Sequence, residues 1–480
     1  MYIYTEEEIR KADRTAEENG LTGNTLMETA GRGLFSAVKE LVGRDQTILI
    51  LSGPGNNGGD GIVLARYLKL NGYTADLVFP VGPPRSETAK EHFRYYKSLG
   101  FQAETTIPEK TYDVIIDALL GVGTRLPLRN DYENVVLWCN EQQALRIAVD
   151  LPTGVLADNG RTETAFRADY TFSLHGYKPS AFLSPSRDYY GEVRRIDIGL
   201  PHDSRWRMWT AEDVRRTLAR RHEASHKGTF GFGLLVAGTD EMPGCAFLAG
   251  QGAMKTGIGK LMIATTPFVA KTVVPRLPEA TYWHNGLEKL AAGEWPEGIS
   301  AVAIGPGLTD VELVERALGR LWDRNVPVIL DAGVLQKRDY PEREAPVIIT
   351  PHPGEFSRLT GIPVAEIQKN RIELAKKYAE EHSVTVVLKG ANTVIAFPDS
   401  TGYVNPTGNA ALAKGGTGDT LTGMILGFVC SGKNVREAVA NAVYLHGLAA
   451  DEWVKTNDER TLLAGELTDL FGQMMYELTR

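Results

Sequence analysis

The most constraining feature of the sequence is a regular alternation of short apolar runs with amphipathic segments. In the first part of the chain, five runs have the composition of buried strands: 47–51, 75–79, 113–118, 145–150 and 169–174. Segments 88–100 and 131–143 between them have helical spacing of apolar residues. Strands that alternate with helices predict a mostly parallel, doubly wound α/β sheet. Two further predicted helices, within 6–20 and 25–43, precede the first strand and are expected to pack on one face.

A second series of apolar runs begins near residue 225 and continues through 260–265, 301–307, 327–333, 345–356 and 385–397. Long helices are expected from about Gly418 to the end. Between the two series lies an arginine-rich stretch without a strand pattern. Because 480 residues exceed one ordinary core, we predict two α/β domains, 1–211 and 212–480. The first would be a Rossmann-like doubly wound sheet.

The composition excludes several classes of protein. A net charge of −8 gives no basic surface for nucleic acid. Cys139, Cys245 and Cys430 are too far apart for a zinc motif, and their odd number argues against a disulfide framework. The first twenty residues are too charged for a signal peptide, and no apolar run reaches spanning length. We therefore expect a cytoplasmic protein with no membrane or nucleic-acid partner.

The first glycine-rich loop has a formal dinucleotide fingerprint, G-x-G-x-x-G, at Gly53, Gly55 and Gly58. It follows an apolar run and precedes a helical segment, as a Rossmann loop does. However, the acidic residue expected at the end of the second strand is absent, since Asp76 lies near the start of that run. The loop also carries polar residues that a pyrophosphate turn does not need. A redox cofactor site is thus disfavoured, and a plain glycine turn is the alternative.

Polar side chains follow two more strands of the first series. Asp117 and Asp150 each end a predicted strand, and Thr153 follows three residues after Asp150. Open α/β sheets bind ligands at the carboxyl ends of their strands. One acidic strand end is explained by a helix cap. Together with Asn57 and Asp60, these ends predict one ligand crevice.

Three motifs carry a resemblance to a known family: GPGNNGGDG (53–61), DALLGVGTRLP (117–127) and AVDLPTGV (148–155). They resemble, in matching order, the NAD(P)HX epimerase domain over roughly residues 1–210. That family interconverts the R and S forms of NADHX and NADPHX, which are NADH and NADPH hydrated at C6 of the nicotinamide ring. The resemblance implies that the loop binds a dinucleotide as substrate rather than as a hydride carrier.

The resemblance also implies particular site residues in the first domain. The substrate would contact Asn56, Asn57, Gly58, Gly59, Asp60, Gly121, Val122, Gly123, Thr124, Arg125, Leu126, Pro127 and Asp150. A potassium ion would use Asn57, Asp117 and Thr153, which supply the oxygen ligands that hard cations require. We assign Asp150 the proton transfers that epimerisation needs.

The strongest motif of the second series is NPTGNAALAKGGTGDTLTGMILG (405–427). Its glycines open a helix, where free backbone N–H groups and the helix dipole cradle a phosphoryl group. Asp419 lies at that point and is suited to take a proton from an attacking hydroxyl. The structural alternative is a glycine turn with Asp419 as a helix cap.

This motif resembles the ribokinase-like fold, and further motifs within 225–480 resemble the ADP-dependent NAD(P)HX dehydratase domain. In that family ADP phosphorylates the C6 hydroxyl and phosphate then leaves. The resemblance assigns Ala246, Gly307, His352 and Asp419 to the hydrated dinucleotide. It assigns the adenine nucleotide to Lys389, Gly390, Ala391, Asn392, Thr393 and Gly418. Mg²⁺ would accompany ADP, with Glu355 as a candidate ligand. His352 is equally compatible with a structural role, and Lys389 with a solvated one.

The resemblance thus predicts a bifunctional cofactor-repair enzyme, which we also expect to be a homo-oligomer. Two alternatives stay open at this point. A ribokinase-like small-molecule kinase fused to a dinucleotide-binding domain would release a stable phosphate ester. A non-catalytic dinucleotide-sensing protein would need neither Asp150 nor Asp419, although both stand in complete motifs.

Overall fold

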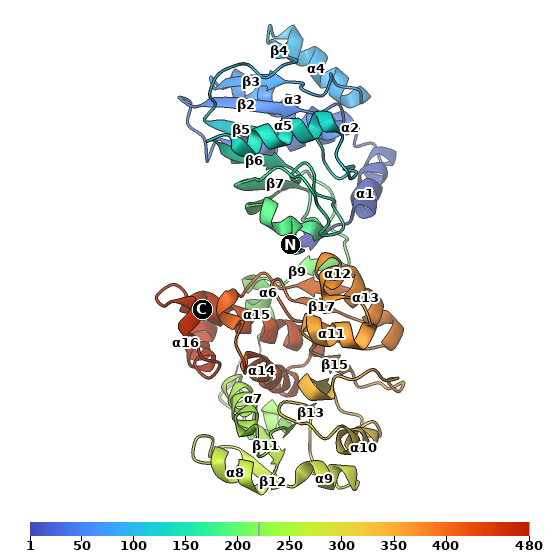
Figure 1. Cartoon of the computed structure of the whole chain (residues 1–480), viewed down its shortest axis with the longest axis vertical. Coiled ribbons are helices and arrows are strands. Elements are labelled where there is room, and N and C mark those ends of the chain that lie inside the picture. Colours follow the sequence, from blue (N-terminus) through green and yellow to red (C-terminus); the bar gives the residue numbers. More distant parts are fainter. Residues whose placement is uncertain (219–220, 480) are drawn as a thin grey trace. The chain divides into compact units, whose positions relative to one another are not determined.

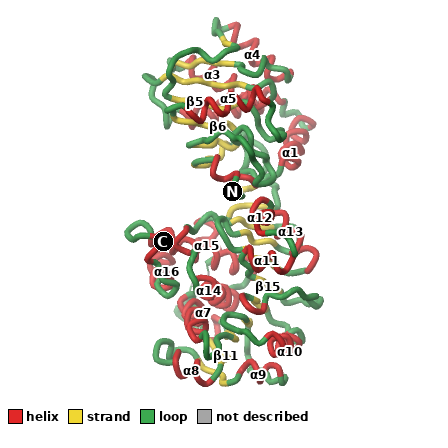
Figure 2. Tube along the Cα trace, viewed as in Figure 1, coloured by secondary structure: helices red, strands yellow, loops and turns green. Residues whose placement is uncertain are grey.

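The computed structural model describes residues 1–218 and 221–479. The chain forms two compact units, Met1–Trp206 with Gln368–Asn370, and Arg207–Ile367 with Arg371–Arg480. In each unit helices flank a central sheet (Figure 1), and the strands are drawn in yellow between red helices in Figure 2. The fold is therefore α/β in both units.

The sheet of the first unit is entirely parallel, with the strand order β4-β3-β2-β5-β6-β7-β8. The helices and strands of the first unit are β1 (Tyr2–Ile3), α1 (Glu6–Glu18), α2 (Gly23–Val38), β2 (Thr47–Ser52), α3 (Asn56–Leu70), β3 (Thr74–Val78), α4 (Glu87–Ser98), β4 (Ala103–Glu104), β5 (Val114–Ala118), α5 (Asn130–Glu141), β6 (Leu145–Val149), β7 (Tyr170–Leu174) and β8 (Glu192–Ile196). The predicted Rossmann-like, doubly wound arrangement is confirmed.

Strand β2 shows why the apolar runs are continuous rather than alternating. Ile48 and Ile50 pack with α2 and α3 on one face of the sheet, whereas Leu49 and Leu51 pack with α5 on the other. A parallel strand covered on both faces needs apolar residues at every position. The chain leaves β2 toward β3 and returns on its other side as β5, so the carboxyl ends of β2 and β5 form a topological switch point, where ligands bind in such sheets.

The second unit has the strand order β9-β18-β17-β16-β15-β14-β13-β10-β11-β12. Neighbours are parallel from β12 to β16, and β17 is antiparallel to both of its neighbours, β16 and β18. The strands are β9 (Trp206–Met208), β10 (Phe232–Val236), β11 (Lys260–Thr265), β12 (Thr281–His284), β13 (Ala301–Ile304), β14 (Val328–Leu330), β15 (Val347–Ile349), β16 (Thr385–Leu388), β17 (Val394–Ala396) and β18 (Gly402–Val404).

The helices of the second unit lie between and after these strands. They are α6 (Ala211–Thr217), α7 (Pro243–Lys255), α8 (Pro267–Val273), α9 (Gly286–Ala291), α10 (Val311–Leu321), α11 (Pro353–Thr360), α12 (Val364–Lys369), α13 (Arg371–His382), α14 (Thr417–Ser431), α15 (Val435–Trp453) and α16 (Leu467–Thr479). Helices α7, α14 and α15 form one apolar core with β10, β11 and β13. The predicted terminal helices begin at α14, one residue before Gly418.

Trp209 lies shortly after the point at which the chain passes from the first unit to the second. Its ring is completely buried in the core of the second unit, where its Nε1 donates to Asn441 Oδ1 at 2.9 Å. It also packs on Tyr403, with ring centroids 4.7 Å apart. The division of the chain between the two compact units falls between Trp206 and Arg207. The 211/212 boundary read from the sequence stays a prediction.

Candidate functional sites

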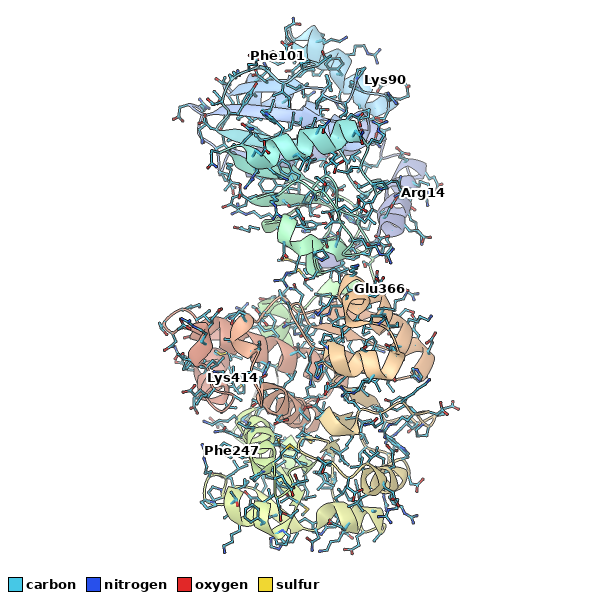
Figure 3. All side chains as sticks on the ribbon, viewed as in Figure 1. Arg14, Lys90, Phe101, Phe247, Glu366 and Lys414 are labelled. Atoms are coloured by element: carbon cyan, nitrogen blue, oxygen red, sulfur yellow. The ribbon has the colours of Figure 1, made fainter. Side chains whose placement is uncertain are left out.

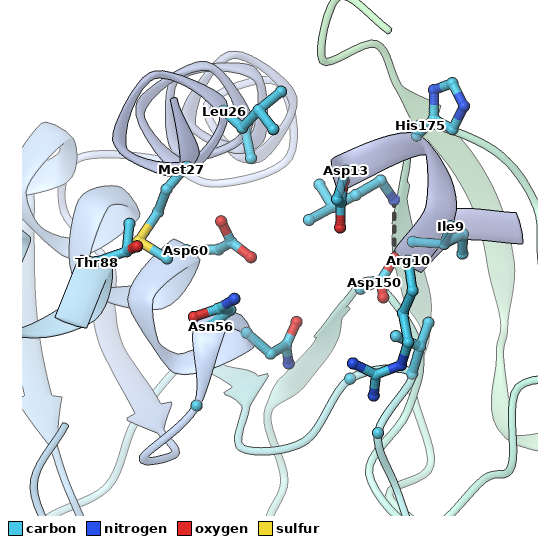
Figure 4. Close-up of a pocket in the computed structure, with 18 of the residues that line it drawn as sticks. Ile9, Arg10, Asp13, Leu26, Met27, Asn56, Asp60, Thr88, Asp150 and His175 are labelled. Atoms are coloured by element: carbon cyan, nitrogen blue, oxygen red, sulfur yellow. Dashed lines mark hydrogen bonds between the residues drawn. The ribbon is translucent and has the colours of Figure 1, made fainter. Parts of the chain in front are cut away.

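A cavity of about 480 Å³ lies at the carboxyl edge of the first sheet (Figure 4). Its walls come from α1, α2 and α3 and from the loops that follow β5, β6 and β7. Of the residues predicted for substrate binding, the structure brings seven together around this cavity: Asn56, Asn57, Asp60, Gly121, Val122, Gly123 and Asp150. Its lining does not include Gly58, Gly59, Thr124, Arg125, Leu126 or Pro127.

The two loops that follow β2 and β5, both of which contribute to the cavity wall, are in close contact. A Cβ added to Gly53 would lie 1.8 Å from the carbonyl oxygen of Leu119, so no side chain fits there. Gly53 N–H also donates to Ala118 O at 2.9 Å. The loop after β2 is therefore fixed against the loop after β5, and glycine serves close backbone approach. Asp76, by contrast, lies within β3, where it pairs with Lys110 at 2.7 Å, so it has a structural partner instead of a ribose.

Asp117 and Thr153, two predicted potassium ligands, are hydrogen-bonded to each other. The Thr153 hydroxyl donates to Asp117 Oδ1 at 2.8 Å and its N–H donates to Oδ2 at 2.8 Å, while Leu119 N–H adds a third bond. Burial raises the pKa of Asp117 to about 6 despite these bonds. Asn57, the third ligand, lies beside Gly121, and its Nδ2 is buried with no hydrogen-bond partner among the described residues. The unpaired atom is an amide nitrogen, which is a hydrogen-bond donor, so Asn57 would have to offer its Oδ1 to a cation, together with the oxygens of Asp117 and Thr153.

Asp150 follows β6 with a positive φ of 72°, which turns its carboxylate toward the cavity. The ammonium of Lys178, itself almost completely buried, donates to Asp150 Oδ1, and Leu174 N–H donates to the same oxygen at 3.2 Å. Lys178 also donates to the carbonyl of Leu174 at 3.0 Å. Asp150 is thus held as one partner of a buried ion pair. The sequence analysis did not find Lys178, which lies in the segment FSLHGYKPSAF (172–182) and belongs to none of the motifs.

Two further carboxyl groups face the cavity. Burial, together with the charges of Asp150 and Asp13, raises the pKa of Asp60 well above its usual value. Burial and the same Asp150 charge raise the pKa of Asp13, on α1, to about 6. Asp60 was predicted as a binding residue, whereas Asp13 was not, because nothing in the sequence shows that α1 forms a wall of the crevice.

The second candidate site lies where α14 begins. Its N-cap is Gly416, and Asp419 is the third residue of the helix, so the alternative of Asp419 as the cap does not hold. Burial raises the pKa of Asp419 to about 6, with Asp331 adding to the effect and a hydrogen bond from Cys245 opposing it. A carboxyl group that titrates near neutral pH suits general-base catalysis.

Lys389 joins α14 to the middle of the sheet. Its ammonium lies 2.9 Å from Asp331 Oδ1, which also accepts from Thr350 at 2.8 Å, while Thr422 donates to Oδ2 at 2.6 Å. Burial alone would raise the pKa of Asp331, but Lys389 and the two hydroxyls hold it below its usual value. A Cβ on Gly418 would lie 3.3 Å from Lys389 Nζ, which places the ammonium at the glycine-rich helix start.

Lys389 is therefore an ion-pair partner rather than a solvated residue. Asp331 stands at the carboxyl end of β14, as Asp117 and Asp150 stand at the ends of β5 and β6. The sequence analysis assigned Asp331 no role, although it too is an aspartate that directly follows an apolar run.

His352 and Glu355 cap α11 reciprocally. His352 Nδ1 accepts from Gly354 N–H at 3.0 Å, and Glu355 Oε2 accepts from His352 N–H at 2.7 Å. Glu355 is buried and lies 4.0 Å from Lys389 Nζ. The His352 side chain is 54% exposed, so its capping role leaves a free face for a ligand.

The remaining predicted residues of this site lie in three loops. Gly307, after β13, has φ 72° and sits against Cys245, next to the fully buried Ala246 of α7. In the loop after β16, Thr393 Oγ1 donates to Gly390 O at 3.0 Å. The structure thus brings together Gly307, Lys389, Gly418 and Asp419 with Asp331 and Glu355. Gly390, Ala391, Asn392 and Thr393 follow Lys389 directly.

Several features bear on ligands and partners. Cys139, Cys245 and Cys430 are free thiols. Within residues 1–218 and 221–479, no group of three or more His, Cys, Asp or Glu side chains is arranged to hold a metal ion. No helix in the described part of the chain is long and apolar enough to cross a membrane.

The two folds and sites define an α/β protein with a dinucleotide-type crevice in one unit and a ribokinase-like phosphoryl-transfer site in the other. Residues 23–180 match the family model described as YjeF-related protein N-terminus, and residues 233–471 match the model of NAD(P)H-hydrate dehydratase. A bifunctional NAD(P)H-hydrate repair enzyme from Moorella thermoacetica is 34% identical over 100% of this chain and 97% of its own length. The corresponding Escherichia coli enzyme is 31% identical over 98% and 93%. The chain belongs to the family of bifunctional NAD(P)H-hydrate repair enzymes.

The second unit has still nearer relatives. The ADP-dependent (S)-NAD(P)H-hydrate dehydratase of Bacillus subtilis is 56% identical over 55% of this chain and 95% of its own length. A crystal structure of the Bacillus subtilis ADP/ATP-dependent NAD(P)H-hydrate dehydratase, co-crystallised with ATP and Mg²⁺, covers 56% of this chain and 98% of its own, with a TM-score of 0.56 and 55% identity. The ribokinase-like fold predicted for the second unit is confirmed.

Proposed function

We propose that the first unit epimerises R- and S-NAD(P)HX and that the second dehydrates S-NAD(P)HX to NAD(P)H at the expense of ADP, giving AMP and phosphate. The observation that carries the proposal is the position of Asp419. A titratable carboxyl group stands within the first turn of a glycine-started helix, with the Lys389 ammonium beside that start. This arrangement joins a base to a phosphoryl cradle.

For the dehydration, Asp419 would take the proton of the C6 hydroxyl as its oxygen attacks the β-phosphoryl group of ADP. Phosphate would then leave C6 while C5 loses a proton, which restores the C5–C6 double bond of the dihydropyridine. Phosphate is a far better leaving group than hydroxide, and this accounts for the need for a nucleotide. Mg²⁺ would neutralise the phosphates, and Glu355 is the candidate carboxylate beside it.

The other predicted residues of the second site are proposed as ligand contacts. Lys389, Gly390, Ala391, Asn392, Thr393 and Gly418 would bind the nucleotide, and Ala246, Gly307 and His352 the hydrated dinucleotide. Support comes from the grouping of Gly307, Lys389 and Gly418 around Asp419.

For the epimerisation, the cavity of the first unit would hold the hydrated ring, with Asp150 in proton transfer. Asn56, Asn57, Gly58, Gly59, Asp60, Gly121–Pro127 and Asp150 would bind the substrate. K⁺ would be held by Asn57, Asp117 and Thr153. The Thr153 hydroxyl lies against the Asp117 carboxylate, and this pairing of two oxygen ligands supports the assignment.

One incubation separates this proposal from its two rivals. The purified chain is mixed with a mixture of R- and S-NADHX and ADP, and absorbance of NADH is followed together with AMP and phosphate. Repair yields NADH, AMP and phosphate in equal amounts and consumes both isomers. A small-molecule kinase would leave a phosphate ester without NADH, and a sensing protein would leave all substrates unchanged. Homo-oligomer formation and cytoplasmic location stay predictions, for light scattering and cell fractionation to test.

A further inference from the structure

The three carboxyl groups around the first cavity differ in their partners. Asp150 is bound by the Lys178 ammonium and by Leu174 N–H. The side chains of Asp13 and Asp60 have no hydrogen-bond or ion-pair partner among residues 1–218 and 221–479. Both are nevertheless part of the cavity lining, and Figure 4 shows them pointing into the same space from α1 and α3. One carboxyl group is thus fixed, and two are available to a ligand.

Helix α1 is built as a wall of this cavity. Arg10, Asp13 and Glu17 recur at helical spacing and all line the cavity, so they form one face of the helix. Arg14, which follows Asp13 in the sequence, is exposed on the surface of the helix (Figure 3). Asp13 is at the centre of the inner face and is only partly buried, so its carboxyl group has access to both the cavity and solvent.

We propose that Asp13 is a further catalytic residue of the epimerisation, acting as the general acid that releases the C6 hydroxyl and as the base in the reverse direction. The inference rests on the proposed function of the first unit. Epimerisation must remove oxygen from one face of C6 and return it to the other. Two proton-transfer groups at different places on the cavity wall meet that requirement better than one fixed carboxylate.

The step can be written with its atoms in balance. Asp13 gives its proton to the C6 hydroxyl, the C6–O bond breaks and water leaves, while the ring nitrogen lone pair forms a C6=N1 iminium bond. A water molecule then adds to the other face of C6, and Asp150 takes the proton that it loses. That proton returns through solvent to Asp13, so neither water nor charge is consumed over the cycle.

The difference in burial between the two side chains favours Asp13 over Asp60 for this role. Burial, Asp150 and Glu17 raise the pKa of Asp13 to about 6, with Lys178 and Arg10 opposing them. A group with that pKa gives up and regains a proton readily near neutrality. The pKa of Asp60 is also raised well above its usual value, by burial and by the charges of Asp150 and Asp13. Asp60 is buried, however, whereas Asp13 is only partly buried, so Asp13 exchanges its proton with solvent more readily.

The test uses the full chain and measures the rate of R-to-S conversion by exchange spectroscopy, with dehydration of S-NADHX by ADP measured on the same samples. Asp13→Asn should lower the epimerisation kcat by about a hundredfold or more, with KM changed by less than about threefold. Dehydration should be unchanged, which shows that the chain is folded. Asp13→Glu should retain measurable epimerisation and its pH profile, and Glu18→Gln, on the exposed part of α1, should match the unmodified chain.

Each outcome decides something different. If the unmodified chain does not interconvert the isomers, the proposed function of the first unit fails. If it does so and Asp13→Asn is equally fast, the assignment of Asp13 is overturned. Asp60→Asn is the matched variant at the other carboxyl group of the cavity and should lose less epimerisation than Asp13→Asn. A greater loss there than in Asp13→Asn would make Asp60 the acid instead.

Discussion

Lys389 Nζ lies 2.9 Å from Asp331 Oδ1, at the end of a strand in the middle of the second sheet. Asp331 is almost completely buried, and two threonine hydroxyls also donate to its carboxylate. The lysine that is proposed to meet the nucleotide is thus also the partner that keeps a buried carboxylate charged. Its removal should affect stability as well as binding.

Replacing Lys389 by methionine should lower the free energy of unfolding by about 3–5 kcal/mol, because it leaves a buried carboxylate uncompensated. Adding Asp331→Asn should recover most of that loss without restoring dehydration. Denaturant unfolding of the single and double variants measures both effects. Equal stability of Lys389→Met and the unmodified chain would show that the ion pair contributes nothing to folding.

Asp419→Asn should reduce NADH formation from S-NADHX and ADP by at least about a hundredfold, as removal of a general base does. The helix should persist, since its start is formed by Gly416 and not by Asp419. Epimerisation in the same chain is the internal control. Near-normal turnover by this variant would remove Asp419 from the mechanism.

The pH dependence of dehydration should follow the same carboxyl group. Burial raises the pKa of Asp419 to about 6, and the base works only when ionised. The kcat/KM for S-NADHX should therefore increase as pH rises through about 6 and level off above it. A profile that falls across this range, measured at saturating ADP and Mg²⁺, would contradict the role of Asp419 as the base.

A fragment of residues 206–480 should dehydrate the S isomer and leave the R isomer untouched. It keeps β9 and the buried Trp209. A fragment that begins at 212 lacks Trp209 and should be less stable by about 3–5 kcal/mol, the usual loss for a large buried aromatic residue. Thermal unfolding of the two fragments measures the difference. Consumption of both isomers at equal rates, after correction for spontaneous epimerisation, would disprove the division of labour.

Potassium should distinguish the two strand-end acids of the first unit. Asp117→Ala removes the carboxylate assigned to the ion, so epimerisation should come to depend on added K⁺. Asp150→Ala removes a proton carrier, and its loss of epimerisation should not respond to K⁺. Rates of R-to-S conversion across a potassium titration test both variants. Rescue of Asp150→Ala by potassium would show that its role is not proton transfer.

The strands of the sheets were largely predictable because a parallel strand covered on both faces is a continuous apolar run. All five predicted strands of the first unit are present. β8 was missed, since its sequence EVRRI at the sheet edge is charged and only partly buried. The predicted run 385–397 is two antiparallel strands, β16 and β17, because the glycine-containing loop turns the chain back.

The site was predictable only where a residue's place follows from strand ends and glycine motifs. Asp117, Asp150 and Asp419 are of this kind, and Asp331 has the same signal. Asp13 lines the cavity from a helix, and Lys178 contacts Asp150 from a loop. The packing of both segments depends on tertiary contacts, which the local sequence does not indicate.

The close approach of Gly53 to Leu119 has a consequence for how this crevice can change. The contact is between two backbones, so the loops that follow β2 and β5 hold each other in place, and binding loses little conformational entropy there. No side chain can be introduced at Gly53 without moving the loop that carries Leu119. Variation in ligand preference should therefore accumulate on the α1 wall, where exchangeable side chains, and not the main chain, define the shape.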